Sequence, residues 1–182
     1  MKRIFGVLMA LLLAGCAAVP AETEPVEVSG TLTVTGLQDS VQVDCNGQTM
    51  EIGPVHGMTE DFFLDCARVT VLGEQALKIT FGETCFLFLG DMTREEQRAL
   101  AEEQGQLSAQ VLQLSGEPAE ELLAAVEPTY ILTPEDTEEA WSREGSHFSF
   151  ERFGPVTVES DGATLNLSWS LHVSHDVASA AE

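Results

Sequence analysis

The sequence predicts a mixed α/β domain in which a layered sheet is covered by helices. Three observations lead to this fold class. The first part of the chain contains short runs of alternating polar and apolar residues, which are typical of half-buried strands. A very hydrophobic hairpin follows at 77–89, and capped helical segments then alternate with strands. The chain has 182 residues, of which 44% are hydrophobic, so it can bury a core and fits one domain.

The first half of the chain is predicted to form antiparallel strands. Residues 31–35 read Thr-Leu-Thr-Val-Thr, in which β-branched polar residues alternate with apolar ones. Strands at 41–45 and 49–52 flank Asn46-Gly47, a pair that favours a tight hairpin turn. Residues 68–72 are also strand-like, so a meander of short strands is expected here.

Apart from the apolar N-terminal segment, the central hairpin is the most hydrophobic part of the chain. Its strands are predicted at 77–81 and 85–89, on either side of Gly82-Glu83. Glycine adopts the positive φ that a tight turn requires without a steric penalty. We therefore place this hairpin at the centre of the sheet.

Helices alternate with strands in the second half of the chain. Thr93 and Glu96 form a capping box for a helix at 94–104, which Gly105 ends. The remaining predicted elements are a strand at 111–114, a helix from Pro118 to Val126, a strand at 130–132, a short acidic helix with Thr133 as N-cap and Pro134 in its first turn, and a closing hairpin of strands at 156–158 and 164–173.

The charge balance excludes one broad class of function. The chain has 30 acidic and 8 basic residues, and its formal net charge is −22. Such a surface repels phosphate backbones, so binding of nucleic acid through a basic face is excluded. The sequence also lacks a P-loop, a G-x-G-x-x-G motif and a G-x-S-x-G elbow, and therefore gives no support for an NTPase, a dinucleotide-binding protein or a serine hydrolase.

The N-terminus has the three-part form of a secretory signal peptide. Lys2 and Arg3 precede an apolar run at 4–13, and small residues follow. The run is too short to cross a bilayer as a permanent helix. Residues 1–15 are therefore interpreted as an export signal and not as part of the fold.

The end of this segment, Leu13-Ala14-Gly15-Cys16, resembles the lipobox of bacterial lipoproteins. The resemblance implies cleavage before Cys16 and acylation of its thiol, which would anchor the chain at the extracytoplasmic face of the cell membrane. The alternative is an ordinary signal peptide with a chance cysteine. Residues 16–28 are acidic and contain proline, as expected of a tether; 29–173 are predicted to form the single domain, and 174–182 a flexible tail.

Three cysteines follow Cys16, namely Cys45, Cys66 and Cys85. An odd number allows at most one internal disulfide in an exported protein and leaves one thiol over. Because Cys45 and Cys85 lie in apolar, strand-like runs, buried free thiols are the preferred interpretation, and the pairing stays open. No C-x-x-C spacing occurs, so no structural zinc site is predicted.

The central hairpin carries a resemblance to a known family. Residues 76–91, ALKITFGETCFLFLGD, resemble the hairpin SL-x-L-x-(Y/F)-G-(D/E)-T-S-F-L-(F/L)-T-G-D of the metallo-β-lactamase fold, in the branch that forms the soluble domain of competence DNA-uptake proteins. Segments within 32–53, 109–130 and 156–162 resemble that branch in the same order along the chain. The resemblance implies a shortened, layered metallo-β-lactamase-like domain.

The same resemblance implies a centre of two zinc or manganese ions, held by an H-x-H-x-D-H loop, two further histidines and the aspartate of a Gly-Asp pair. In this chain only Asp91 clearly matches a ligand. Residues 113–116 read Gln-Leu-Ser-Gly, with no histidine where the ligand loop should follow. The stretch between Ile52 and Val69 is too short for the helix, strand and loop that the family has there.

One further segment, His-Gly-Met-Thr-Glu-Asp, can be aligned with H-x-H-x-D-H and would place His56 and Glu60 at ligand positions. Met58 and Asp61 replace two of the histidines, and methionine is a poor ligand for zinc or manganese. A chance turn sequence is therefore the preferred interpretation. His147 can be compared with a late histidine of the family, but a surface histidine is preferred there.

These observations favour an exported lipoprotein with a degenerate, non-catalytic metallo-β-lactamase-like domain that acts in binding or envelope structure. We expect no metal cofactor, no nucleic acid, and an unidentified protein or small-molecule partner. The alternative is a divergent metal-dependent hydrolase that uses Asp91 with His56, Glu60 or His147 to hold zinc or manganese. A third interpretation is an envelope protein that shares only the strand pattern of the family.

Overall fold

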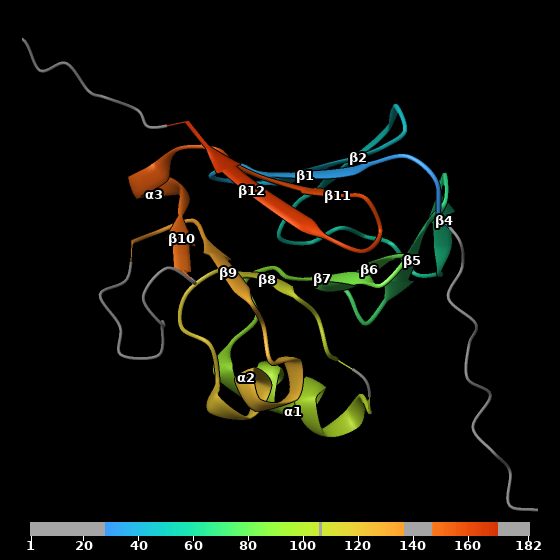
Figure 1. The fold of residues 1–182 in the computed structure, drawn as a ribbon. Coiled ribbons are helices and arrows are strands. Elements are labelled where there is room, and N and C mark those ends of the chain that lie inside the picture. Colours follow the sequence, from blue (N-terminus) through green and yellow to red (C-terminus); the bar gives the residue numbers. More distant parts are fainter. Residues whose placement is uncertain (1–27, 106, 137–146, 171–182) are drawn as a thin grey trace, which may run out of the picture.

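Two stacked β-sheets and a pair of helices form three layers (Figure 1). The computed structural model describes residues 28–105, 107–136 and 147–170. A five-stranded sheet is one outer layer, a seven-stranded sheet is the middle layer, and two helices cover the other face of the middle layer. The predicted mixed α/β fold, a layered sheet with covering helices, is confirmed.

The five-stranded sheet is antiparallel throughout, in the order β12-β11-β1-β2-β3. Its strands are β1 (Leu32–Gly36), β2 (Val41–Cys45), β3 (Gln48–Ile52), β11 (Val156–Ser160) and β12 (Leu165–Trp169). The turn between β2 and β3 has positive φ at Asn46 (52°) and Gly47 (88°), as the Asn-Gly pair predicts. The predicted closing hairpin is β11–β12.

The seven-stranded sheet has the order β10-β9-β8-β7-β6-β5-β4. Its strands are β4 (Phe62–Leu64), β5 (Ala67–Val71), β6 (Ala76–Phe81), β7 (Thr84–Leu89), β8 (Val111–Leu114), β9 (Tyr130–Thr133) and β10 (His147–Ser149). β4 to β7 pair antiparallel, whereas β7 to β10 pair parallel. β7, from the predicted central hairpin, is the middle strand.

The helices are α1 (Arg94–Glu103), α2 (Glu120–Val126) and α3 (Phe150–Phe153). α1 begins at the predicted capping box, in which the Thr93 side chain accepts from the Glu96 backbone N–H and the Glu96 carboxylate accepts from Thr93. None of the helices within the described residues has the length and apolar character needed to cross a membrane.

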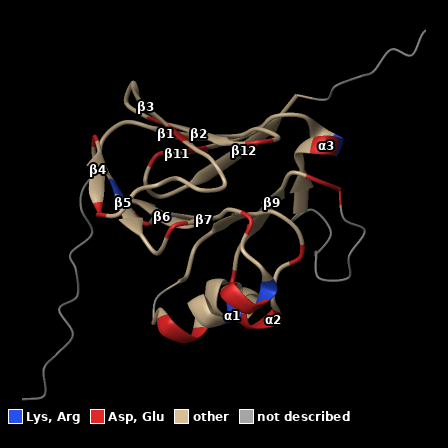
Figure 2. Cartoon of the chain, turned by 180° about the vertical axis from the view of Figure 1, so that it is seen from behind, with Lys and Arg blue, Asp and Glu red and all other residues tan. Residues whose placement is uncertain are grey.

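Acidic residues lie along α1 and α2 and on several loops (Figure 2). Arg94 pairs with Glu117, and Arg98 Nε lies 3.1 Å from Glu121 Oε2, so two ion pairs link α1 to α2 and the turn before it. Both pairs are exposed, and pairs of this kind contribute roughly 0–1 kcal/mol each. The helices are therefore held mainly by the apolar side chains beneath them.

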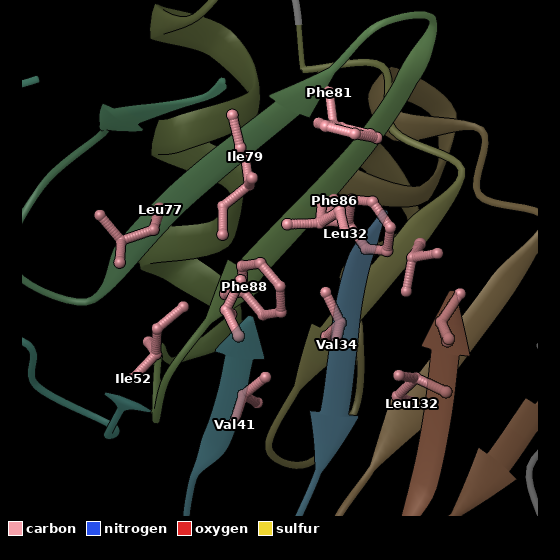
Figure 3. Packing of buried hydrophobic residues seen from close by; sticks show 14 of the residues in the cluster. Leu32, Val34, Val41, Ile52, Leu77, Ile79, Phe81, Phe86, Phe88 and Leu132 are labelled. Atoms are coloured by element: carbon pink, nitrogen blue, oxygen red, sulfur yellow. The ribbon is translucent and has the colours of Figure 1, made fainter. Parts of the chain in front are cut away.

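The largest core cluster lies between the two sheets. Figure 3 shows Ile79, Phe86 and Phe88 of the middle sheet pointing towards Leu32 and Val34 of the outer sheet. A second cluster lies between the middle sheet and the helices and includes Leu87, Leu89, Leu112, Leu114, Leu100 and Leu122. Because β7 is covered on both faces, its sequence is almost continuously apolar instead of alternating.

The structure differs from the sequence prediction in two respects. No helix begins at Thr133: this residue ends β9, and its hydroxyl donates to the carbonyl of Glu135 at 2.7 Å. Residues 137–146, where the predicted helix would continue, lie outside the described residues. The short elements β4, β10 and α3 were not predicted, because three or four residues give too little periodicity to recognise.

Candidate functional site

A cleft of about 300 Å³ opens where the two sheets meet at the carboxyl ends of β7, β8 and β9. In open α/β sheets, ligands bind preferentially beyond the carboxyl ends of parallel strands. The lining residues are Leu37, Gln38, Asp39, Ser40, Val41, Ile52, Gly53, Pro54, Phe88, Gly90, Asp91, Gln113, Ser115, Gly116, Pro134 and Glu135. Both sheets therefore contribute to one concave surface.

Gly90 brings the two sheets together beside the cleft. Its N–H donates to the carbonyl of Gln75 at 2.8 Å, and its own carbonyl accepts from the Ser115 N–H at 3.4 Å. A Cβ atom at this position would lie 1.9 Å from the carbonyl oxygen of Pro54, which follows β3. Only glycine permits this approach, so the Gly-Asp pair places Asp91 at the cleft beside the end of β3.

The opposite wall is the turn that joins β1 to β2. It contributes Gln38, Asp39 and Ser40 to the lining, and the Leu37 N–H donates to the Ser40 carbonyl at 2.8 Å, which closes the turn. The third wall is the segment after β9, where Glu135 lies. Asp39, Asp91 and Glu135 are all exposed, so the walls of the cleft carry negative charge that solvent can reach.

The polar atoms that the lining side chains offer are all oxygen or amide nitrogen. None of the described lining residues is histidine or cysteine. Zinc in proteins is held by imidazole and thiolate with carboxylate, whereas carboxylate, amide and hydroxyl oxygens suit harder cations such as Mg²⁺, Ca²⁺ or Mn²⁺. The side chains present therefore do not fit the histidine-rich dinuclear centre that the family resemblance implies.

The predicted site residues do not gather around Asp91. Among the described residues, the groups of three or more His, Cys, Asp or Glu whose ligand atoms lie within 4.8 Å of one another include neither Asp91 nor His56 nor Glu60. Asp91 lies in the cleft, whereas His56 and Glu60 are not among its lining residues. Glu60 is exposed in the loop before β4.

His56 is half-buried in the loop after β3. Its backbone N–H donates to the Glu74 carbonyl at 3.4 Å, and its Nδ1 accepts from the Met58 N–H at 3.0 Å. Nε2 is buried without a hydrogen-bond partner among the described residues. The Nδ1 contact closes a local turn around His-Gly-Met.

His147 lies in β10 and is half-buried, not fully exposed as a surface histidine would be. Its Nε2 lies 2.7 Å from Thr133 Oγ1, whose hydroxyl already donates to the Glu135 carbonyl. The Thr133 oxygen therefore accepts a hydrogen bond from Nε2–H, and its own hydroxyl hydrogen is directed to Glu135 and not to this histidine. Desolvation lowers the pKa of His147 and Arg152 adds to the effect, whereas Asp136 opposes it. The contact between Thr133 and His147 therefore positions the wall of the cleft at Pro134 and Glu135, and it does not activate the Thr133 hydroxyl as a nucleophile.

Most of the cleft could not be found from the sequence. Asp91 was singled out, but Asp39 and Glu135 were not. One available signal is the polar or small residue that directly follows each parallel strand, such as Ser115 after β8 and Pro134 after β9. No sequence pattern indicates that the β1–β2 turn lines the cleft, because its position there depends on how the two sheets stack.

Comparisons with known proteins give one distant neighbour. No protein-family model matches the chain, and no curated protein sequence matches it. A crystal structure from Thermotoga maritima, assigned to the Zn-dependent hydrolases of the metallo-β-lactamase superfamily, is 11% identical, with a TM-score of 0.39. The match covers 59% of this chain and 77% of that chain. A likeness this distant assigns no residue roles, and the family resemblance stays a prediction.

Proposed function

We propose that this chain is an exported, lipid-anchored binding protein whose domain holds a small ligand in the cleft and does not hydrolyse it. The observation that carries this proposal is the chemistry of the cleft. It lies at the ends of three parallel strands and contains Asp39, Asp91 and Glu135 but no histidine or cysteine among its described lining residues. Carboxylates and amides of this kind favour a ligand with cationic or hydrogen-bond-donating groups.

The cleft is large enough for a small molecule but not for a folded partner. Its volume of about 300 Å³ is at the lower end of the range for ligand pockets. The apolar side chains of Val41, Ile52 and Phe88 form its floor, and the polar groups stand around the rim. A short polyamine is a suitable probe, because its methylene groups can contact the floor while its ammonium groups face the carboxylates.

The binding proposal is tested by thermal unfolding of the full chain with spermidine at about 0.15 M salt, where long-range attraction to the acidic surface is screened. The melting temperature is expected to rise with spermidine in the parent protein and to rise much less in Asp91→Asn/Glu135→Gln. The matched control is Glu102→Gln/Glu103→Gln, which removes the same charge from the exposed end of α1. Equal loss of the shift in both variants, or no shift in the parent, contradicts the proposal.

The second candidate is a divergent metal-dependent hydrolase, and the position of Asp91 favours it. Asp91, the residue that the family resemblance identifies with the aspartate ligand, follows the central strand and lines the cleft. The test is metal content after incubation with zinc or manganese, with melting curves before and after a chelator. Stoichiometric metal with a chelator-sensitive melt would support the hydrolase and overturn the metal-free proposal. No retained metal would eliminate the hydrolase.

Membrane attachment is proposed from Cys16 alone, which lies outside the described residues. In a bacterial host, the parent chain should fractionate with membranes and carry acyl groups at Cys16 by mass spectrometry. Cys16→Ser should be recovered without acyl groups. An unmodified Cys16 in the exported parent protein would contradict the anchor and leave the binding proposal standing.

A further inference from the structure

Two thiols from different sheets lie side by side at the end of the molecule where the β2–β3 and β4–β5 turns meet. Cys45 is the last residue of β2, and Cys66 lies in the short turn between β4 and β5. Their Sγ atoms are 3.8 Å apart across a sequence separation of 21 residues. Figure 1 shows β4 standing at one side of the molecule between the levels of the two sheets.

Hydrogen bonds between the two turns hold these sulfur atoms together. Asn46 Nδ2 lies 2.6 Å from Asp65 Oδ2 and 3.5 Å from Cys66 Sγ. The Asp65 N–H donates to Gln48 Oε1 at 3.0 Å, so the two hairpin turns contact each other at more than one point. The proximity of Cys45 and Cys66 is therefore built by their neighbours and does not depend on a bond between the sulfur atoms.

We propose that Cys45 and Cys66 are a disulfide-forming pair that links the five-stranded sheet to the seven-stranded sheet when the protein meets a disulfide oxidant. The oxidant is a low-molecular-weight disulfide such as oxidised glutathione, or an exchangeable disulfide of a thiol oxidoreductase. This modification site is separate from the cleft, because neither cysteine lines it. The inference does not depend on the proposed binding function.

The reaction is thiol–disulfide exchange in two steps. The Cys66 thiolate attacks one sulfur of the oxidant, forms a mixed disulfide and releases one thiolate. The Cys45 sulfur then attacks Cys66 Sγ, loses its proton to water and displaces the second thiolate. Overall, two protein thiols and one oxidant disulfide give one protein disulfide and the two thiols of the reduced oxidant, so the protein is oxidised and the oxidant is reduced.

The surroundings of the two thiols give this order. Cys66 is half-buried, so an external disulfide can reach it, and its sulfur accepts from the Asn46 amide. Cys45 is fully buried, and burial together with the hydrogen bond to Cys66 raises the pKa of its thiol to about 11. A buried, weakly acidic thiol reacts slowly with external oxidants, but it can attack a mixed disulfide held 3.8 Å away.

The same atoms could instead hold a metal ion. Cys45, Asp65 and Cys66 are a described group whose ligand atoms all lie within 4.8 Å of one another. The Asn46 amide, however, already donates to Asp65 and Cys66 from within this group. A fully buried Cys45 with a raised pKa also disfavours the thiolate that a metal requires. The disulfide is therefore favoured, and metal retention is an outcome of the test.

Cys85 provides the matched control. It lies in β7 and packs with the cluster between the middle sheet and the helices, whereas Cys45 belongs to the cluster between the two sheets. Its Sγ contacts Thr80 Oγ1 at 3.8 Å. A disulfide that forms by proximity in the folded protein should therefore leave Cys85 reduced.

The test uses the full chain with Cys16→Ser, purified reduced and incubated folded with oxidised glutathione, then alkylated and digested without reduction. A single Cys45–Cys66 linked peptide is expected, with Cys85 alkylated. The melting temperature should rise by roughly 10 °C on oxidation and return with dithiothreitol, because the cross-link restricts the unfolded chain. Cys66→Ser should abolish the redox-dependent shift, and Cys85→Ser should keep it.

Three results would overturn the proposal. The first is that Cys45 and Cys66 are both alkylated after oxidation of the folded protein. The second is a linkage that involves Cys85. The third is stoichiometric zinc in the reduced protein that Cys66→Ser loses, which would assign the group to a metal. Because the linked peptide and the melting shift are read on a chain that keeps Cys45 and Cys66, the proposal stays testable even if Cys66→Ser fails to fold.

Discussion

The middle of the seven-stranded sheet is covered on both faces, whereas the five-stranded sheet meets solvent on its outer face. In β7, Phe86 and Phe88 pack towards the other sheet, while Leu87 and Leu89 pack towards the helices. In β2, only alternate residues are buried, and Gln42 between them is exposed. The seven-stranded sheet therefore contributes side chains to both core clusters, and the five-stranded sheet covers only one of them.

This difference has a physical origin in strand connection. β7, β8 and β9 are parallel, so the chain must return between them, and α1 and α2 provide the return along one face. The five-stranded sheet is antiparallel, and short turns are sufficient for its hairpins. α1 and α2 thus accompany the parallel strands, whose carboxyl ends are left to form the cleft.

The largest expected effect is loss of a ring from the doubly covered strand. Phe86 is fully buried in the cluster between the sheets, and Phe86→Ala is expected to lower the free energy of unfolding by about 3–5 kcal/mol through lost burial and a cavity. Urea unfolding measures this. Gln42→Ala, on the solvent side of the other sheet, should change stability by less than about 0.5 kcal/mol. Similar costs for the two variants would refute the contrast between the sheets.

The same contrast explains what could be predicted from the sequence. Five apolar residues at 85–89 placed the central strand correctly, because a strand buried on both faces has a signal that local sequence carries in full. β4 was missed because it has three residues, of which Phe63 is 67% exposed, so its pattern resembles a loop. Its pairing with β5 depends on the sheet that it joins.

Thr133 and Pro134 show how tertiary contacts override a local motif. A threonine followed by proline and acids is a good helix start, yet Thr133 continues β9 and pairs with Ser149 of β10, because Leu132 beside it belongs to the main core. The cleft follows the same rule. Asp91 was found through a linear motif, whereas Asp39 and Glu135 reach the cleft only through the stacking of two sheets. Residues that meet by stacking have no fixed spacing in the sequence.

A second prediction concerns the place where the ends of the two sheets touch. Gly90→Ala would place a methyl group 1.9 Å from the Pro54 carbonyl oxygen if nothing moved. Because the obstacle is backbone, the segments after β7 and β3 must separate, at a cost of about 1–3 kcal/mol. Gly105→Ala is the control, since a Cβ there has nothing within 4 Å. A neutral Gly90→Ala would mean that the two sheets are not tightly held beside the cleft.

A polar link between the sheets should contribute somewhat less. Thr84 Oγ1 of β7 and Ser160 Oγ of β11 lie 2.7 Å apart and are buried, and Ser160 Oγ also accepts from the Gly162 N–H at 3.0 Å. Ser160→Ala leaves that N–H without its acceptor, which should cost about 1–2 kcal/mol in urea unfolding. The exposed Ser168→Ala is the control in β12. If Ser160→Ala and Ser168→Ala lower the free energy of unfolding equally, the buried hydrogen bond between the sheets does not contribute to stability.

The smallest expected effect lies at the edge of the seven-stranded sheet, where β10 leaves His147 only half-buried. Burial lowers the pKa of His147 below its ordinary value of 6.5, so the unfolded chain takes up this proton first as the pH falls. The stability that the neutral imidazole contributes is complete above pH 6.5 and is lost as the pH falls from there towards the lowered pKa of the folded state.

Urea midpoints measured between pH 7.5 and 5.5 should therefore decrease in the parent protein. His147→Gln should flatten the decrease, whereas Asp161, whose pKa is lowered by the N–H groups of Thr164 and Ala163, titrates below this range in both proteins. An unchanged slope in His147→Gln would show that this edge is as open to water as the outer face of the five-stranded sheet.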